Sequence, residues 1–295
     1  MRLEPGWRAR LTLAGVLAGL FAALGLYQVL EANGLQQTSL FYVGVPAVIA
    51  ITVALTARAR TCTGLIMATI TIGLALAGPL LGEGVVCLLM AAPLFYLVGL
   101  VVGLAVDWMR RDTGRRNASL VVAPLLLAVA LEGATPATSL PREGEVTAVR
   151  AVAPGTDVEA ALAGSPRFGP VTSPFLRLGF PRPVRSEGLG LAAGDARTVV
   201  FTPRRSLGIG APLEPRSMTL RVVSRGPGLA VFGVERDTTL ARWLDLHAAE
   251  FRWGDGRLEV TLRYRRTFDP GWYFGPLQRY ALSEAAGYLA AAFVP

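Results

Sequence analysis

Lysine is absent from this chain of 295 residues, so all 29 basic residues are arginines. Without lysine the chain cannot build a Schiff-base enzyme or a P-loop nucleotide site. The arginines are scattered, whereas a nucleic-acid binder would gather them on one face beside stacking aromatic residues. The net charge of +8 therefore says little about partners, and we expect no nucleic acid among them.

Histidine and cysteine are almost as scarce. His247 is the single histidine, and the two cysteines, Cys62 and Cys87, lack the spacing of a metal site. The glycine-rich run Gly188–Gly194 misses the dinucleotide-binding spacing and has no strand-helix-strand context. We therefore expect no metal and no cofactor, and we interpret both cysteines as packing residues.

Charge is low overall, at 17% of residues, and it is unevenly distributed. Residues 1–134 hold 6 acidic and 9 basic residues, whereas the remaining chain holds 15 and 20. This difference predicts a helical membrane domain at 1–134, a linker rich in small residues and proline at 135–142, and a water-exposed domain at 143–295.

Long hydrophobic runs dominate the first part. A transmembrane helix needs about 20 apolar residues to cross the hydrocarbon core. Four runs without Asp, Glu or Arg meet this length, and a fifth is shorter and contains a proline: Leu11–Leu30, Leu40–Ala57, Thr63–Leu81, Val85–Val106 and, as the fifth, Ala118–Leu131. We expect about five spans, with the first retained because it is longer than the apolar part of a signal peptide.

The arginines indicate which side of the membrane each end faces. They occur at positions 2, 8, 10, 58 and 60 and again at 110–116, whereas the loop Glu31–Ser39 and the turn Gly82–Gly84 contain none. Under the positive-inside rule the N-terminus and both arginine-bearing loops are cytoplasmic. If Ala118–Leu131 spans, which we favour, the second domain is extracytoplasmic; if it does not, that domain is cytoplasmic. In either case the protein is expected in the cell membrane.

The polar residues inside the expected spans are Thr52, Thr69, Thr71 and Tyr96. Transporters and pumps usually place ionisable groups there, and these threonines can instead bond to a carbonyl one turn back. We therefore expect an anchoring bundle with no conducting path. Two motifs, Gly15-x-x-x-Gly19 and Gly99-x-x-x-Gly103, fit close packing between helices.

The second part alternates between strand and helix signals. A valine-rich strand is followed by a short helix that begins at the capping box Thr156–Glu159, and a further helical turn is expected around Pro174–Leu178. Several antiparallel strands follow, and one long helix closes the chain. The expected strands are Glu145–Ala153, Glu187–Leu191, Arg197–Thr202, Met218–Ser224, Leu229–Asp237, Arg242–Trp253 and Arg257–Phe268, and the expected helix is Pro276–Phe293.

This order resembles the helix-grip arrangement of the START-like, or polyketide cyclase-dehydrase (SRPBCC), superfamily. Four features carry the resemblance: the opening strand with its capped helix, the run Gly190-x-x-x-Gly194-x-x-Arg197-x-x-x-Phe201 leading into a central strand, the hairpin Phe251–Tyr264 with its exit Asp269–Pro276, and the closing helix Leu277–Phe293. The resemblance covers residues 143–295 and contains no catalytic signature. It implies an α+β domain with a curved antiparallel sheet, a long C-terminal helix and an apolar cavity between them.

Polarity sets the expected register of the last hairpin. Pairing Trp253 with Leu258 and Phe251 with Val260 places apolar residues on one face, and a slip of one residue would exchange the faces. This register predicts that Ala249 lies opposite Leu262, His247 opposite Tyr264, and Asp245 opposite Arg266. All six would face inward.

These inward residues, with Phe251 and with Tyr288 of the closing helix, form the candidate ligand site. His247 and Tyr264 could perform general acid-base chemistry. The alternative is that they only hydrogen-bond each other, while Asp245 and Arg266 pair at the rim. The sequence leaves three functions open: binding of a hydrophobic small molecule or lipid beside the membrane, which we favour; an enzyme of cyclase or hydrolase type; and a non-catalytic sensory or interaction module.

Overall fold

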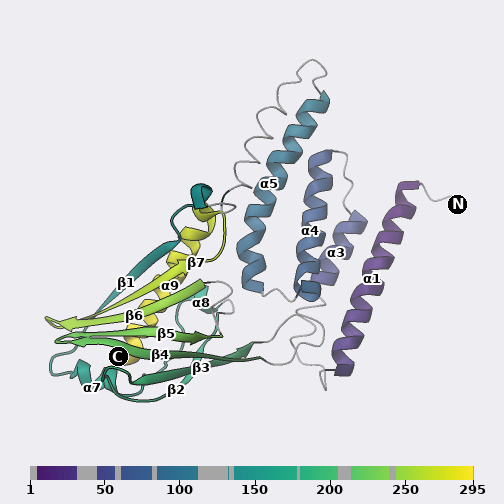
Figure 1. Cartoon of the computed structure of the whole chain (residues 1–295). Coiled ribbons are helices and arrows are strands. Elements are labelled where there is room, and N and C mark those ends of the chain that lie inside the picture. The colour runs from purple at the N-terminus through teal and green to yellow at the C-terminus, as the bar shows by residue number, and fades with distance from the viewer. Residues whose placement is uncertain are drawn as a thin grey trace. The chain divides into compact units, whose positions relative to one another are not determined.

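The structure, a computed structural model, describes residues 5–31, 45–56, 61–81, 85–111, 132, 136–177, 180–204, 214–238 and 244–294. Contacts between residues divide the chain into two compact units (Figure 1). The first contains the helices before residue 112, and the second contains the described chain from Glu132 onward. The short run Ala118–Leu131, expected as a fifth span, lies outside the described residues.

Four helices form the described part of the first unit, and each coincides with one of the four long hydrophobic runs. They are α1 (Pro5–Glu31), α3 (Val45–Thr56), α4 (Cys62–Leu81) and α5 (Val85–Arg111). Among the described residues, one helical segment is long and apolar enough to cross a membrane, Cys87–Trp108 of α5. Two shorter apolar segments are Ala9–Ala23 and Cys62–Ala77. The described chain thus supports one candidate span, not the four or five expected.

Helices α4 and α5 approach closely where the sequence places two glycines. A Cβ atom added at Gly103 would lie 2.6 Å from the Cα atom of Thr63, and one added at Gly99 would lie 2.3 Å from a methyl carbon of Ile70. Asp107 of α5 accepts hydrogen bonds from the backbone N–H groups of Cys62 and Thr63, at 2.7 and 3.0 Å. A carboxylate from one helix therefore satisfies free amides at the start of another.

The expected bonding of the threonines to carbonyls one turn back is confirmed in α4. The Thr69 hydroxyl donates to the carbonyl of Leu65 at 2.9 Å, and the Thr71 hydroxyl lies 2.8 Å from the Met67 carbonyl. Thr71 also shares a hydrogen bond of 2.8 Å with the hydroxyl of Tyr96 on α5. These contacts join the two helices and satisfy polar groups that face apolar neighbours.

The second unit is built on one seven-stranded antiparallel sheet with the order β1-β7-β6-β5-β4-β3-β2. Its strands are β1 (Glu143–Ala151), β2 (Pro183–Glu187), β3 (Ala196–Arg204), β4 (Glu214–Gly226), β5 (Leu229–Asp237), β6 (Leu244–Gly254) and β7 (Arg257–Arg266). The register shifts within four of the strand pairs, and such bulges bend a sheet. The expected curved antiparallel sheet is confirmed.

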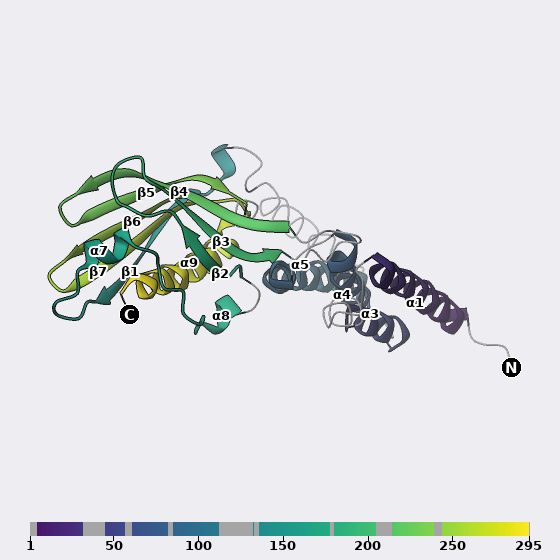
Figure 2. The ribbon, with the colours of Figure 1, turned by 90° about the horizontal axis from the view of Figure 1, so that it is seen from below.

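A long helix, α9 (Gly271–Phe293), lies along the concave side of this sheet and closes the unit (Figures 1 and 2). It begins five residues earlier than expected, so Pro276 lies inside it and not in its first turn. The N–H groups of Tyr273 and Phe274 bond to the Pro270 carbonyl, which sets the start. Small residues on the buried face, among them Ala281, Ala286 and Ala290, let the helix approach the sheet.

Two short helices, α7 (Val158–Ala163) and α8 (Pro174–Arg177), connect β1 to β2, as expected. The N-cap of α7 is Asp157, whose carboxylate accepts from the N–H of Ala160 at 2.9 Å, so the capping box expected from Thr156 is wrong. Glu159, the other half of that box, pairs instead with Arg225 of β4.

The β6–β7 hairpin confirms the expected register in its outer half. Trp253 pairs with Leu258, Phe251 with Val260, and Ala249 with Leu262. The two-residue turn consists of Asp255 and Gly256, with φ angles of +49° and +69°. Two positive φ angles in such a turn match the right-handed twist of the strands that it joins.

Candidate functional site

An apolar cavity of about 180 Å³ lies between the sheet and α9 in the second unit. Its sheet wall comes from inward-facing residues of β3 to β7, including Val199, Phe201, Phe232 and Leu262. On β3 the lining positions are 197, 199 and 201, because alternate residues of a strand point to the same face. The expected cavity between sheet and closing helix is therefore present.

One face of α9 forms the opposite wall. The lining residues Leu282, Ala285, Leu289 and Phe293 follow one another at intervals of three and four, the spacing of one helical face. Phe293 meets Phe251 of β6 edge to face, with ring centroids 5.4 Å apart. Helix and sheet thus touch at this aromatic pair and stand apart where the cavity lies.

A β-bulge in β6 overturns the inner half of the expected hairpin register. The register shifts between Leu246 and Ala248, so that Leu246 pairs with Tyr264 and Leu244 pairs with Arg266. The side chain of His247 is therefore exposed on the other face of the strand. The extra residue lets both leucines face the interior, which lowers the free energy by burying apolar surface.

The expected pairing of His247 with Tyr264 is therefore wrong. The imidazole Nε2 lies 3.8 Å from a carboxylate oxygen of Glu143 and 4.0 Å from one of Asp245, both on exposed side chains. Tyr264 is buried on the inner face, where its ring covers Gly144 of the neighbouring strand. The two side chains proposed for acid-base chemistry thus point to opposite faces of the sheet.

Four of the eight predicted site residues line the cavity: Ala249, Phe251, Leu262 and Tyr288. The Tyr288 hydroxyl donates a hydrogen bond of 2.8 Å to the carbonyl of Gly169, in the loop between α7 and α8. Burial raises the pKa of Tyr288, an effect that the nearby charge of Arg182 partly offsets. Tyr288 therefore enters the cavity wall as a neutral side chain.

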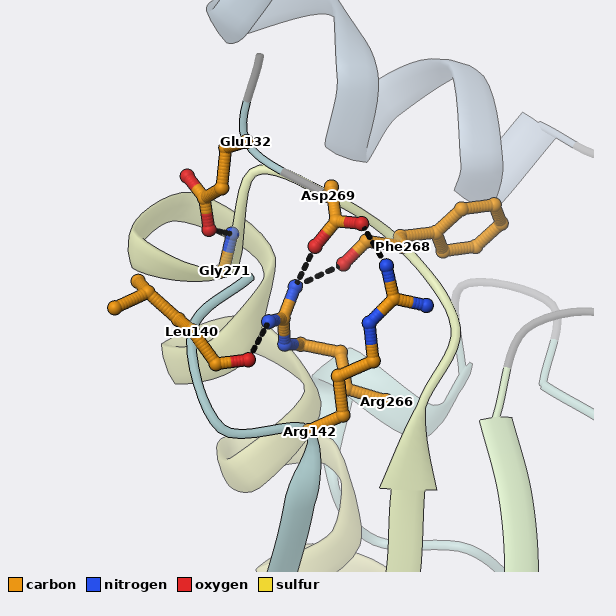
Figure 3. A network of polar contacts seen from close by, with 7 residues as sticks. All are labelled: Glu132, Leu140, Arg142, Arg266, Phe268, Asp269 and Gly271. Carbon is orange, nitrogen blue, oxygen red and sulfur yellow. Dashed lines mark hydrogen bonds and ion pairs between the residues drawn. The ribbon is translucent and has the colours of Figure 1, made fainter. Parts of the chain in front are cut away.

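The expected pairing of Arg266 with Asp245 is wrong. Arg266 belongs instead to a network at the start of α9 (Figure 3). Its Nη1 atom donates to the Phe268 carbonyl and to Asp269 Oδ1, the latter at 2.6 Å. Its Nη2 atom donates to the Leu140 carbonyl at 3.3 Å. The guanidinium thus satisfies groups from two loops and has a structural role.

The same network ties the segment before β1 to the turn before α9 (Figure 3). Asp269 also accepts from Arg142, and the Gly271 N–H donates to Glu132 Oε1 at 2.6 Å. A Cβ atom at Gly271 would lie 2.4 Å from an Arg266 nitrogen, so a side chain at this position would displace the guanidinium. The acidic group at the start of α9 also suits the positive end of the helix dipole.

Arg197, on β3, is a buried cation in the cavity wall that the sequence analysis did not single out as a site residue. Its side chain is only 4% exposed. Nη2 donates to the carbonyl of Leu162 at 2.7 Å and lies 3.5 Å from that of Ala163, at the end of α7. The guanidinium carbon lies 5.4 Å and 5.6 Å from the ring centroids of Phe232 and Phe293.

Among the described residues, no carboxylate pairs with Arg197, and its buried Nε atom has no hydrogen-bond partner. Burial lowers the pKa of Arg197, because the charged form loses its hydration. The sequence did contain a signal for this residue: Arg197, Val199 and Phe201 alternate along a strand, so an arginine shares the apolar face.

A glycine-rich loop between β2 and β3 positions Arg197. Gly190 and Gly194 have φ angles of +100° and +95°, which favour glycine, and the Gly190 N–H donates to the Ala163 carbonyl at 2.8 Å. A Cβ atom at Gly190 would lie 2.2 Å from an Asp195 carboxylate oxygen. The run from Gly190 is thus a loop that contacts the end of α7. It leads into β3, which is next to the edge strand β2 and is not a central strand.

No group of three His, Cys, Asp or Glu side chains suited to a metal ion occurs within the described residues. Neither a family model nor a curated protein matches the sequence. Solved structures do match the second unit. Major latex-like protein 151 from Panax ginseng is 12% identical and covers 52% of this chain and 99% of its own, with a TM-score of 0.30. Protein CV1439 from Chromobacterium violaceum is 10% identical and covers 51% and 98%, with a TM-score of 0.32.

The second unit has a helix-grip fold. The strand order, the two short helices between β1 and β2, and the long helix on the concave face define this fold within the structure itself. A helix-grip fold does not by itself choose among functions, so the function must be argued from the cavity.

Proposed function

We propose that the helix-grip domain binds a hydrophobic small molecule or a lipid in the cavity between its sheet and α9. The observation that carries this proposal is the cavity itself, which is lined almost entirely by apolar side chains. Ligand sites in proteins are typically apolar hollows with a few polar groups that orient the ligand. The SRPBCC-like fold is consistent with such a role.

The cavity volume limits the size of the buried part of the ligand. A dry apolar cavity of about 150 Å³ accommodates benzene in another protein. At about 180 Å³, this cavity fits one aromatic ring with a short alkyl group, or the end of a lipid chain. We therefore expect a small apolar ligand, or a larger one that buries only its tail.

A cavity-filling variant tests the binding proposal. The full chain, reconstituted in lipid nanodiscs, should bind the neutral probe 4-ethylbenzyl alcohol in isothermal titration calorimetry. The Ala285→Phe variant should lose about tenfold or more in affinity, because the new ring occupies the volume that the probe needs. Leu289→Phe provides a second variant of the same wall.

His247→Ala is the matched control, since this side chain is exposed and lies outside the cavity wall. It should leave the affinity for the probe unchanged. Absence of probe binding, or equal binding by the filled variants, would refute the proposal. A loss of affinity in His247→Ala would point back to a site on the outer face.

We propose further that the helical unit anchors this domain in a membrane. Large apolar side chains of α5 are exposed, among them Leu89, Phe95, Leu97 and Leu104 at 49–55%. Such a surface is costly in water and favourable in hydrocarbon. Cys87–Trp108 is the best-supported span, and the fuller form of the proposal has α1, α3, α4 and Ala118–Leu131 crossing as well.

Alkaline carbonate extraction of membranes tests the anchor. An integral protein should stay in the pellet, and release into the supernatant would contradict the proposal. Reporter fusions after Arg116 and after Pro141 determine on which side the domain lies. The distribution of arginines supports an extracytoplasmic domain.

A further inference from the structure

We propose that the ligand of this cavity carries a carboxylate group and that Arg197 binds it. This inference rests on the proposed ligand-binding function and adds the chemistry of the ligand's polar end. Its basis is the combination of a buried cation, a cavity wall and an unsatisfied hydrogen-bond donor in one side chain.

A buried charge without a partner is costly, and proteins usually pair it. Within the described chain, the lining residues of the cavity include no Asp or Glu, so the wall offers Arg197 no counter-ion. The two arginines of the wall, Arg197 and Arg182, leave it with positive charge only. A ligand anion would supply the missing partner.

The geometry of the guanidinium also favours a carboxylate. Its planar fork of N–H groups matches the two oxygens of a carboxylate and binds them in parallel. The carbonyls at the end of α7 engage Nη2, and the buried Nε has no hydrogen-bond partner among the described residues. The N–H of Nε is therefore left for an acceptor on a ligand.

Two structural roles compete with this proposal. Arg197 satisfies carbonyls at the end of α7, and its guanidinium contacts the faces of Phe232 and Phe293. Both contacts stabilise the cation, but neither uses the Nε hydrogen. If Arg197 had only a structural role, the affinity for a probe would not depend on the probe's charge. This dependence can be measured.

Three probes of similar size distinguish a carboxylate site from a structural role of Arg197: 4-ethylbenzoate, 4-ethylbenzyl alcohol and 4-ethylbenzylamine. They share one ring and one short tail and differ in the charge of the polar group. Each is titrated into the full chain in nanodiscs, with empty nanodiscs as the blank. We expect the benzoate to bind about tenfold or more tightly than the alcohol, and the amine to bind most weakly.

Arg197→Met keeps an unbranched apolar side chain beside the two phenylalanines and removes the charge. It should abolish the preference for the benzoate while leaving the affinity for the alcohol within about threefold. Arg197→Lys should retain part of the preference, because it keeps the charge but loses the fork. Circular dichroism confirms that each variant is folded.

Arg265→Gln is the matched control, since Arg265 is an exposed arginine that does not line the cavity. It should leave the benzoate preference intact. Equal binding of benzoate and alcohol by the wild type, or loss of the preference in Arg265→Gln, would overturn the carboxylate inference and leave the cavity function standing. Failure of all three probes to bind would overturn both.

Discussion

Arg266 and Arg197 are equally buried, at 4% exposure each, yet their surroundings are opposite. Arg266 lies at the start of α9, where a carboxylate and two carbonyls accept its hydrogen bonds. Arg197 lies in the wall of an apolar cavity, where the end of α7 engages one terminal nitrogen only. In the first arrangement the chain supplies acceptors for both terminal nitrogens, whereas in the second the Nε donor has no partner among the described residues.

The comparison separates two reasons for burying an arginine. Around Arg266, the guanidinium holds together segments that are far apart in the sequence, as Figure 3 shows. Around Arg197, the neighbouring loops are already joined by backbone hydrogen bonds, such as that between Gly190 and Ala163. A contribution to stability explains why Arg266 is buried, but it does not account for the unpaired Nε donor of Arg197.

The largest expected effect on the free energy of unfolding comes from removing the charge of Arg266, and removing that of Arg197 gives the comparison. Arg266→Met should lower the free energy of unfolding by about 3 kcal/mol, because it removes one of the two arginines that pair with Asp269 and the donor to two carbonyls. Arg197→Met should change it by less than about 1 kcal/mol, because relief of the buried charge offsets the lost hydrogen bond. Chemical denaturation of the full chain measures both.

Arg265→Met is the control for this pair, since Arg265 neighbours Arg266 on β7 but is half exposed. Its effect should stay within about 0.5 kcal/mol. If Arg197→Met proves as destabilising as Arg266→Met, Arg197 is structural and the contrast between the two sites is lost.

A third arginine sharpens the comparison at the surface, where the expected effect is smallest. Arg221 of β4 donates hydrogen bonds to Glu235 of β5, one of them at 3.1 Å, and these lower the pKa of Glu235. The pair therefore stabilises the fold above the ordinary pKa of a glutamate, and the contribution is lost as the pH falls through the lower, folded value.

Arg221→Gln should raise the pKa of Glu235 toward its ordinary value with little effect on stability at neutral pH. A carboxyl-carbon titration by nuclear magnetic resonance, with labelled glutamate, measures the shift. Because both groups are exposed, added salt should weaken the effect in the wild type. A pKa unchanged by the substitution would show that the pair is not formed in solution.

The sequence predicted much of the helix-grip domain because its signals are local. Alternation and turn chemistry placed β5 at its observed bounds and the β6–β7 hairpin in its observed outer register. The bulge beside His247 could not be predicted in this way, because its cause is the burial of Leu244 and Leu246 against distant parts of the core. In a regular ladder these two leucines would face outward.

The site was predicted less well, for a related reason. Apolar lining residues such as Phe251 and Leu262 follow from strand periodicity, whereas the burial of Arg197 depends on α7, β5 and the end of α9. These elements are far apart along the chain. Arg266 was correctly placed on the inner face, but its partner, Asp269, is three residues away, not across the hairpin.

The bulge in β6 has a consequence for the shape of the domain. Before the bulge the even-numbered residues Leu244 and Leu246 face inward. After it the odd-numbered residues Ala249, Phe251 and Trp253 do, because the bulge adds one residue to the strand. If β6 lacked that residue, the same side chains would face inward from a regular, less bent strand. The surplus residue therefore contributes curvature, and the depth of the hollow beneath the sheet depends on it.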